Sequence, residues 1–255
     1  PHSFTELAAD AEYHTAVSWL VGTGITAGVA AGKYAPNANV TRGQMAVFLH
    51  RNSCGGTPIA VDGGERHNCV AKADGTVACW GHNSDGQMGI GSSNNQQWTP
   101  VVVRGLNDAT DIATGSFHTC AVKADSSVAC WGNNRNGQLG DGTTTNRNLP
   151  VAVSGLSGVR SVTAGSYHTC ATKTDGTVAC WGLNNNGQIG DGTKTQRTTP
   201  VNVGAGLSGV TSVAAGAEHT CAQKDDGTVA CWGLNTRGQL GDGTNTNRST
   251  PVAVL

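Results

Sequence analysis

Cysteine and histidine recur together at four places in this chain of 255 residues, and they are the side chains with the most chemistry to offer. At each place a histidine is followed two positions later by a cysteine, and a second cysteine lies ten positions further on. The four pairs are Cys69 with Cys79, Cys120 with Cys130, Cys170 with Cys180, and Cys221 with Cys231. Two thiols can oxidise to a disulfide, or they can hold a metal ion together with the histidine.

The residues between the paired cysteines favour the disulfide. An aspartate lies at the midpoint of each pair, and glycine follows it in three of the four repeats. A loop such as Ala73-Asp74-Gly75 closes a hairpin when its glycine takes the left-handed conformation, and the two cysteines then face each other on adjacent strands. Opposed positions of the closer kind bring the Cα atoms to ~4.5 Å, which a disulfide accepts. We therefore predict four disulfides, one within each repeat.

Zinc and buried free thiols are the alternatives to this interpretation. Zinc would need a fourth ligand in every repeat, and His82 has no counterpart in the other three. Nine cysteines in a chain with only 13% charged residues indicate an oxidising compartment. We therefore expect a secreted or cell-surface protein, in which Cys54 is free or pairs with another chain.

The cysteine pairs belong to a longer repeated unit with a period of about 50 residues. Each copy predicts a first strand, the cysteine hairpin, a glycine-rich loop and a last strand introduced by proline. Four short strands in a repeat of this length are typical of a propeller blade, which predicts a mainly β fold. The four copies cover residues of about 59–109, 110–159, 160–210 and 211–255.

Residues 1–53 do not share the repeat. Apolar residues recur at helical spacing from Tyr13 to Val21, and Thr41-Arg42-Gly43-Gln44 has the pattern of a capping box before a second helix. We expect a small α-helical module at 1–53, a glycine-containing linker at 54–58 and a propeller segment at 59–255. The first four residues lack the basic and apolar regions of a signal peptide, so we expect a mature product or a trimmed start.

The motifs of the N-terminal segment resemble those of S-layer homology modules. They are Phe4-Thr5-Glu6-Leu7, Gly24-Ile25-Thr26-Ala27-Gly28, Tyr34-Ala35-Pro36 and Val40-Thr41-Arg42-Gly43-Gln44-Met45-Ala46. The resemblance implies a bacterial protein held to cell-wall polysaccharide. Arg42 matches the basic contact of that family; otherwise it is a solvated residue in the first turn of a helix.

The motifs of the repeats resemble those of the regulator of chromosome condensation propeller family. They read Gly-x-x-His-Thr-Cys, Val-Ala-Cys-Trp-Gly, Gly-Gln-Leu-Gly-Asp-Gly-Thr and Thr-Pro-Val. The resemblance implies propeller blades and says little about activity. Relatives of this fold usually close a ring of seven blades, whereas this chain carries four. The ring is therefore incomplete, four-bladed, or completed by another chain.

Comparison of the four copies separates scaffold from candidate recognition residues. The invariant histidines are better explained by one repeated hydrogen bond than by four active sites, and the invariant tryptophans by packing between blades. Variable residues precede each invariant histidine at a loop where a rim can form, and others follow each Trp-Gly. The candidates of the first set are Glu65, Arg66, Phe117, Tyr167 and Glu218. Those of the second set are Asp85, Arg135, Asn185 and Arg237.

Composition narrows the function classes. With a net charge of -1 the chain has no basic field for nucleic acid, and no apolar run reaches the ~20 residues that cross a bilayer. We find no catalytic motif and expect no cofactor or metal; the Asp141, Asp191 and Asp242 loops are interpreted as turns rather than calcium sites. We predict a protein that binds another protein or cell-wall polysaccharide through the propeller rim. The alternatives are an extracellular hydrolase or lyase acting on polysaccharide and an inhibitor of a secreted enzyme.

Overall fold

The computed structural model describes residues 56–93, 96–204 and 207–255. Within these ranges the fold is entirely β, as the repeats predict: sixteen strands form four sheets of four strands each. No helix long and apolar enough to cross a membrane occurs in the described ranges. The predictions for residues 1–53, including two helices and the role of Arg42, lie outside them, as does Cys54.

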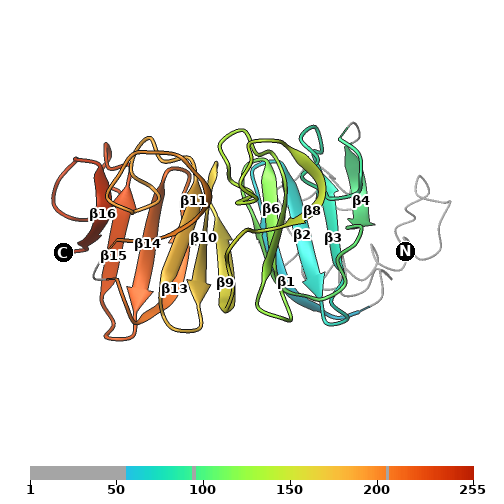
Figure 1. Ribbon diagram of the computed structural model, residues 1–255, viewed down its shortest axis with the longest axis horizontal. Helices are drawn as coiled ribbons and strands as arrows, with labels where there is room; N and C mark the ends of the chain where they lie inside the picture. The colour runs from blue at the N-terminus through green and yellow to red at the C-terminus, as the bar shows by residue number, and fades with distance from the viewer. Residues whose placement is uncertain (1–55, 94–95, 205–206) are drawn as a thin grey trace, which may run out of the picture. The chain divides into compact units, whose positions relative to one another are not determined.

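Each repeat forms one antiparallel sheet, which we call a blade, and its strands are hydrogen-bonded in chain order (Figure 1). Blade 1 contains β1 (Pro58–Gly63), β2 (His67–Lys72), β3 (Val77–Gly81) and β4 (Gln97–Val102). Blade 2 contains β5 (Ala109–Thr114), β6 (His118–Lys123), β7 (Val128–Gly132) and β8 (Arg147–Ala152). Blade 3 contains β9 (Val159–Ala164), β10 (His168–Lys173), β11 (Val178–Gly182) and β12 (Arg197–Asn202). Blade 4 contains β13 (Val210–Ala215), β14 (His219–Lys224), β15 (Val229–Gly233) and β16 (Arg248–Ala253).

The second and third strands of every blade form the predicted hairpin. In blade 1 the N–H of Gly75 donates to the carbonyl of Lys72 at 2.8 Å, and Gly75 has φ +80°. This is the three-residue loop with a left-handed last residue, so Cys69 lies opposite Cys79. The four predicted disulfides are present, with Cα–Cα distances of 4.0–4.2 Å.

Blade 2 departs from this loop chemistry because serine replaces the glycine. Ser126 has φ +62°, and it is the one described residue other than glycine with a positive φ. A side chain in the left-handed region is strained by contact with its own backbone. The fold therefore holds Ser126 in the conformation that glycine adopts in the other three hairpins.

The hydrophobic core lies between successive blades, which pack face to face. One cluster joins blades 1 and 2, a second joins blades 2 and 3, and a third joins blades 3 and 4. A tryptophan from the later blade is fully buried in each cluster, namely Trp131, Trp181 and Trp232. Repeats that bury their faces only against neighbours form a stack, and its two ends carry the loops that can vary.

Candidate functional site

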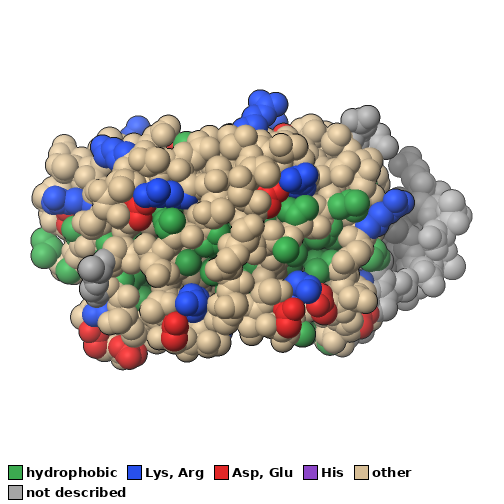
Figure 2. All heavy atoms as spheres, in the orientation of Figure 1, with side chains coloured by type: hydrophobic (Ala, Val, Ile, Leu, Met, Phe, Trp, Pro, Cys, Tyr) green, Lys and Arg blue, Asp and Glu red, His purple; other side chains and the backbone are tan. Residues whose placement is uncertain are grey.

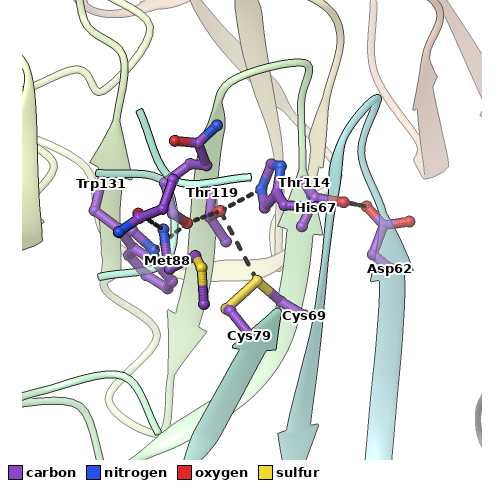
Figure 3. The surroundings of a disulfide bond; sticks show 10 residues. Asp62, His67, Cys69, Cys79, Met88, Thr114, Thr119 and Trp131 are labelled. Carbon is purple, nitrogen blue, oxygen red and sulfur yellow. Dashed lines mark hydrogen bonds between the residues drawn. A yellow bond between two sulfur atoms is a disulfide. The ribbon is translucent and has the colours of Figure 1, made fainter. Parts of the chain in front are cut away.

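Histidine, threonine, glutamine and tryptophan form one hydrogen-bonded unit at each of the three described blade–blade boundaries, and Figure 3 shows the surroundings of the first. At the first boundary, His67 Nε2 lies 2.8 Å from Thr119 Oγ1, and Thr119 Oγ1 donates to the carbonyl of Gln87 at 2.8 Å. Trp131 Nε1 donates to the same carbonyl at 2.8 Å. The second and third boundaries repeat it with His118, Thr169, Gln138 and Trp181, and with His168, Thr220, Gln188 and Trp232. The repeated hydrogen bond predicted for the histidines is therefore one that ties blade to blade.

These contacts determine the tautomer of the buried histidines. The single hydroxyl proton of Thr119 is used on Gln87, so His67 must donate its Nε2–H to the threonine oxygen. Its Nδ1 is then a bare acceptor, and it has no hydrogen-bond partner among the described residues. The imidazole is neutral, and a second proton would lie buried without an acceptor.

Burial accordingly lowers the pKa of these imidazoles. It lowers the pKa of His67 to about 4, and nearby His82 adds to the effect. It lowers the pKa of His118 and of His168 to about 3, again with help from the neighbouring histidines of the column. Burial also lowers the pKa of His219, which is less enclosed. The column is therefore uncharged at neutral pH, which suits a structural role.

The variable residues before each histidine come together at one end of the blade stack. We call this end the recognition rim; it carries the loops between the first and second strands and between the third and fourth strands. The Arg66 guanidinium lies 5.9 Å from the centre of the Phe117 ring. Phe117 and Tyr167 are stacked with centroids 6.2 Å apart and planes 27° apart. Arg66, Phe117 and Tyr167 thus form a ladder of planar groups across three blades, which we call the rim ladder.

His82 also belongs beside the rim ladder, which the sequence interpretation missed. The ring centroids of His82 and Phe117 lie 6.3 Å apart in an edge-on arrangement. The backbone N–H of His82 donates to the backbone carbonyl of Arg66 at 2.8 Å. The equivalent backbone bond recurs in every blade, because each residue after Trp-Gly donates to the residue before the histidine. The sequence contained a signal for this neighbour. His67 lies opposite Gly81 in the hairpin register, so Arg66 and His82 are the next pair of residues along the two chain segments.

Charge is unevenly distributed along the rim. Arg66 Nε lies 3.5 Å from Glu65 Oε1, and both side chains are more than half exposed. Such an exposed pair contributes little to stability. At the other end, Glu218 Oε2 accepts a hydrogen bond from Asn186 Nδ2 at 3.3 Å. The rim therefore carries a cation in blade 1, an aromatic ring in each of blades 2 and 3, and a carboxylate in blade 4.

The structure divides the second variable set into two different positions. The N–H groups of Asp85 and Arg237 donate to the side chains of the invariant Gln87 and Gln239, so these two residues are equivalent. Arg135 lies one position earlier, as does Asn185. The second set therefore includes two different loop positions. The counterparts of Asp85 in blades 2 and 3 are Asn136 and Asn186.

Asp85 and its counterpart Asn186 connect one blade to the next. Asp85 Oδ1 accepts hydrogen bonds from the amides of Asn133 at 2.8 Å and Asn146 at 3.0 Å in blade 2. Asn186 Oδ1 accepts from Asn247 in blade 4 at 3.0 Å. Arg135 and Arg237 are exposed on the rim beside these contacts.

The aspartates of the Gly-Asp-Gly-Thr loops are used within their own blades. The Arg147 guanidinium binds Asp141 Oδ2 through Nε at 2.9 Å and through its terminal nitrogen at 2.8 Å. Asp141 Oδ1 accepts from Thr143 and Asn134. The same pattern fills Asp191 and Asp242 in blades 3 and 4. These carboxylates therefore hold the loop to the fourth strand, in agreement with their interpretation as turn residues.

The opposite end of the stack, which carries the cysteine hairpins, has a different character. Asp175 Oδ1 accepts from both the N–H and the hydroxyl of Thr177, and Lys173 lies 3.3 Å from its other oxygen. Related lysine–aspartate pairs occur in blades 2 and 4. Figure 2 shows acidic and basic side chains along the edge where these hairpins lie. This end presents alternating charge, whereas the aromatic residues lie on the recognition rim.

Asp62 and Asp111 are carboxylates on the first strands of blades 1 and 2, and the enzyme alternative would need such acids as catalytic groups. Asp62 Oδ2 accepts from the N–H and the hydroxyl of Thr114, and Asp111 accepts from the N–H groups of Ile112 and Val162. Burial raises the pKa of Asp111, and the charge of Asp62 adds to this effect. Asp62 Oδ2 and Asp111 Oδ2 each bond to the first strand of the next blade, so these two oxygens connect neighbouring blades. No group of three or more metal-ligating side chains occurs among the described residues.

The four-stranded repeats, their shared boundaries and the variable rim define a class of protein: a β-propeller repeat scaffold. The chain belongs to the RCC1-like domain family, whose family model matches residues 18–255. The resemblance of the repeats to that family is confirmed. The match begins inside the N-terminal segment, and no finding supports a separate S-layer homology module there.

Several relatives share the repeat but are longer. The ultraviolet-B receptor UVR8 of Arabidopsis thaliana is 34% identical over 206 residues, which are 76% of this chain and 36% of that protein. The human probable E3 ubiquitin-protein ligase HERC4 is 32% identical over 202 residues, covering 77% of this chain and 19% of that protein. The chain thus spans well under half the length of these relatives.

Solved structures show the same fold. Human WBSCR16 superposes with a TM-score of 0.71 and 28% identity, covering 78% of this chain and 53% of that one. Yeast RCC1 (Prp20), solved bound to Kap60, superposes with a TM-score of 0.69 and 22% identity, covering 78% and 49%. The second likeness shows the fold alone.

Proposed function

We propose that this chain is a secreted or cell-surface binding protein that captures a macromolecular partner through the recognition rim. The observation that carries the proposal is the rim ladder, because Arg66, Phe117 and Tyr167 are the variable residues that lie together in space. Aromatic residues and arginine are the side chains enriched at the energetic centres of interfaces. Glu65 lies beside Arg66 of the ladder, and Glu218 and the exposed Arg135 and Arg237 lie on loops of the same rim, where they would supply a polar border.

The disulfides support both the compartment and the mechanism. Four crosslinks between adjacent strands persist in an oxidising environment, which favours secretion or display at the surface. They also brace thin, glycine-rich blades, so that little conformational entropy is lost when a partner binds. A second copy of the chain is a further possible partner, since a ring completed by another chain was one of the expected architectures.

Replacement of both rings tests the proposal. Phe117→Ala with Tyr167→Ala should abolish partner capture, whereas thermal stability should change little because both side chains lie on the rim outside the three core clusters. The matched control is Trp98→Ala, which removes a ring that is 80% exposed on β4 and lies outside the ladder. Capture is measured with immobilised chain and the secreted proteins and wall material of the source cells. Equal retention by wild type and double variant would move the site elsewhere.

The N-terminal segment adds a separate proposal. Its resemblance to S-layer homology modules favours attachment to cell-wall polysaccharide, with Arg42 as the contact. Arg42→Ala in the full chain should reduce sedimentation with purified cell walls by about tenfold, since a charge-assisted contact is worth about 1.5–3 kcal/mol. The Phe117→Ala/Tyr167→Ala chain is the control and should sediment like wild type. Loss of sedimentation in the control alone would place wall binding on the rim.

A rim that binds proteins also suits an inhibitor of a secreted enzyme, which is the second function that the ladder favours. Such an inhibitor would place Phe117 and Tyr167 against the target enzyme. Added chain would then lower the activity of the captured enzyme, and the double variant would not.

A further inference from the structure

The four blades present equivalent positions on the rim, but only three of them carry planar side chains. The residue directly before the histidine is Arg66 in blade 1, Phe117 in blade 2 and Tyr167 in blade 3. Their carbonyls, and that of Glu218 in blade 4, accept the same backbone hydrogen bond at 2.8–2.9 Å. The four positions are therefore held alike, and the side chains step from blade to blade by about 6 Å, as the two measured contacts show.

Blade 4 breaks the ladder with a carboxylate. Glu218 is half-buried, and its neighbour Ala217 is small and exposed. Asn186 holds Glu218 Oε2, and Asn186 is itself fixed by the amide of Asn247. Among the described residues no lysine or arginine forms an ion pair with Glu218. Tyr167 and Glu218 thus occupy equivalent rim positions in successive blades, a ring in blade 3 followed by an oriented carboxylate in blade 4.

The other end of the ladder shows what such a position accepts. There the Arg66 guanidinium lies over Phe117 and pairs with the neighbouring carboxylate of Glu65. A guanidinium is planar, stacks on aromatic faces and binds a carboxylate through two parallel N–H groups. Tyr167 with Glu218 repeats this combination of ring and carboxylate, but the chain supplies no arginine. We propose that a partner protein supplies it, by inserting an arginine side chain between Tyr167 and Glu218 as the fourth planar group of the ladder.

This inference rests on the proposed function and identifies the chemistry of the partner. A lysine ammonium fits less well, because it is a point charge that cannot stack as a plane or bind the carboxylate at two points. A neutral sugar would use the Tyr167 ring but would gain nothing from the charge of Glu218. The rim therefore favours a protein partner with an exposed arginine over a wall polysaccharide.

The test uses the full chain and the peptide Ac-Gly-Arg-Gly-NH2, with binding followed by the ring signals of Tyr167 in NMR spectra. The chain has three tyrosines, so the Tyr167 signals are assigned by their loss in Tyr167→Phe. The arginine peptide should shift these signals, and Glu218→Gln should weaken its binding at least about fivefold, from the lost charge-assisted contact. The matched control is Asp225→Asn, which removes one exposed carboxylate of the same blade at the hairpin end and should bind like wild type.

Three results would overturn the inference. One is a citrulline peptide, which has the same shape without the charge, binding as well as the arginine peptide. Another is unchanged affinity in Glu218→Gln. The third is a shift of the Tyr167 signals by a cell-wall oligosaccharide and not by the arginine peptide. If Glu218→Gln still captured the natural partner while Phe117→Ala/Tyr167→Ala did not, the rim function would stand and the arginine assignment would fail.

Discussion

Acid should weaken this fold through its column of buried histidines. His67, His118 and His168 are neutral in the folded chain, with pKa values lowered to about 4, 3 and 3, whereas an unfolded histidine titrates near 6.5. The folded pKa is the lower one, so the stabilisation is complete above pH 6.5. This stabilisation is lost as the pH falls from 6.5 towards the pKa values of the folded chain, because the unfolded chain then binds protons that the folded chain does not bind.

The magnitude follows from these shifts. Between about pH 6 and pH 4.5 each histidine changes the free energy of unfolding by about 1.4 kcal/mol per pH unit, so the three together give about 4 kcal/mol per unit. At pH 5 the loss is about 2 kcal/mol per histidine relative to pH 8. The loss summed over the three histidines is a large fraction of the 5–15 kcal/mol by which domains are usually stable.

Denaturant titrations at a series of pH values between 8 and 4.5 measure this slope. His118→Gln provides the internal comparison: it removes one titrating group, so the slope should fall by about a third even if the variant is less stable at every pH. A free energy of unfolding that stays level between pH 7 and pH 5 would refute the assignment of neutral, buried imidazoles. A slope unaffected by His118→Gln would assign the effect to other groups.

Two further predictions concern the scaffold. Ser126→Gly should stabilise the chain by about 1 kcal/mol, because it relieves the left-handed strain at φ +62°. The midpoint of chemical denaturation measures this, and Ser127→Gly, which removes the hydroxyl hydrogen bond to Asp125, should shift it the opposite way. Thr169→Val should cost about 2 kcal/mol, because it leaves His118 Nε2–H without an acceptor and removes the donor to the Gln138 carbonyl. Thr169→Ser keeps the hydroxyl and should cost less, and a Thr169→Val chain as stable as wild type would contradict the role of the hydroxyl.

The sequence predicted the scaffold well because each prediction depended on local chemistry. The aspartate and glycine of Ala73-Asp74-Gly75 specify the hairpin, and the hairpin register brings Cys69 opposite Cys79. Repetition then extended one correct hairpin to four. The same argument placed the invariant tryptophans between blades, since an identical large apolar residue in every copy has an identical environment.

The candidate site was predicted less completely, because its contacts run between repeats. Arg66, Phe117 and Tyr167 lie about fifty residues apart in turn, and only the stacking of blades brings their side chains to about 6 Å from each other. The role of His82 depends on a backbone bond between two loops of one blade. The loops after each Trp-Gly show a further limit: their variable residues lack a pattern of their own, so the position of Arg135 must be counted from the invariant Gln138.

The separation of these two kinds of residue has a functional consequence. The histidine and glutamine of one repeat bond to the threonine and tryptophan of the next, and their polar atoms meet inside the stack. At the adjacent variable position, the backbone carbonyl provides the contact that all four blades share, through the bond that the backbone N–H of His82 makes to Arg66 and that its counterparts repeat. Because a carbonyl is present whatever the side chain, this position can change from arginine to phenylalanine, tyrosine or glutamate without loss of the tie. A rim assembled from such positions can acquire a new partner specificity while every blade boundary stays intact.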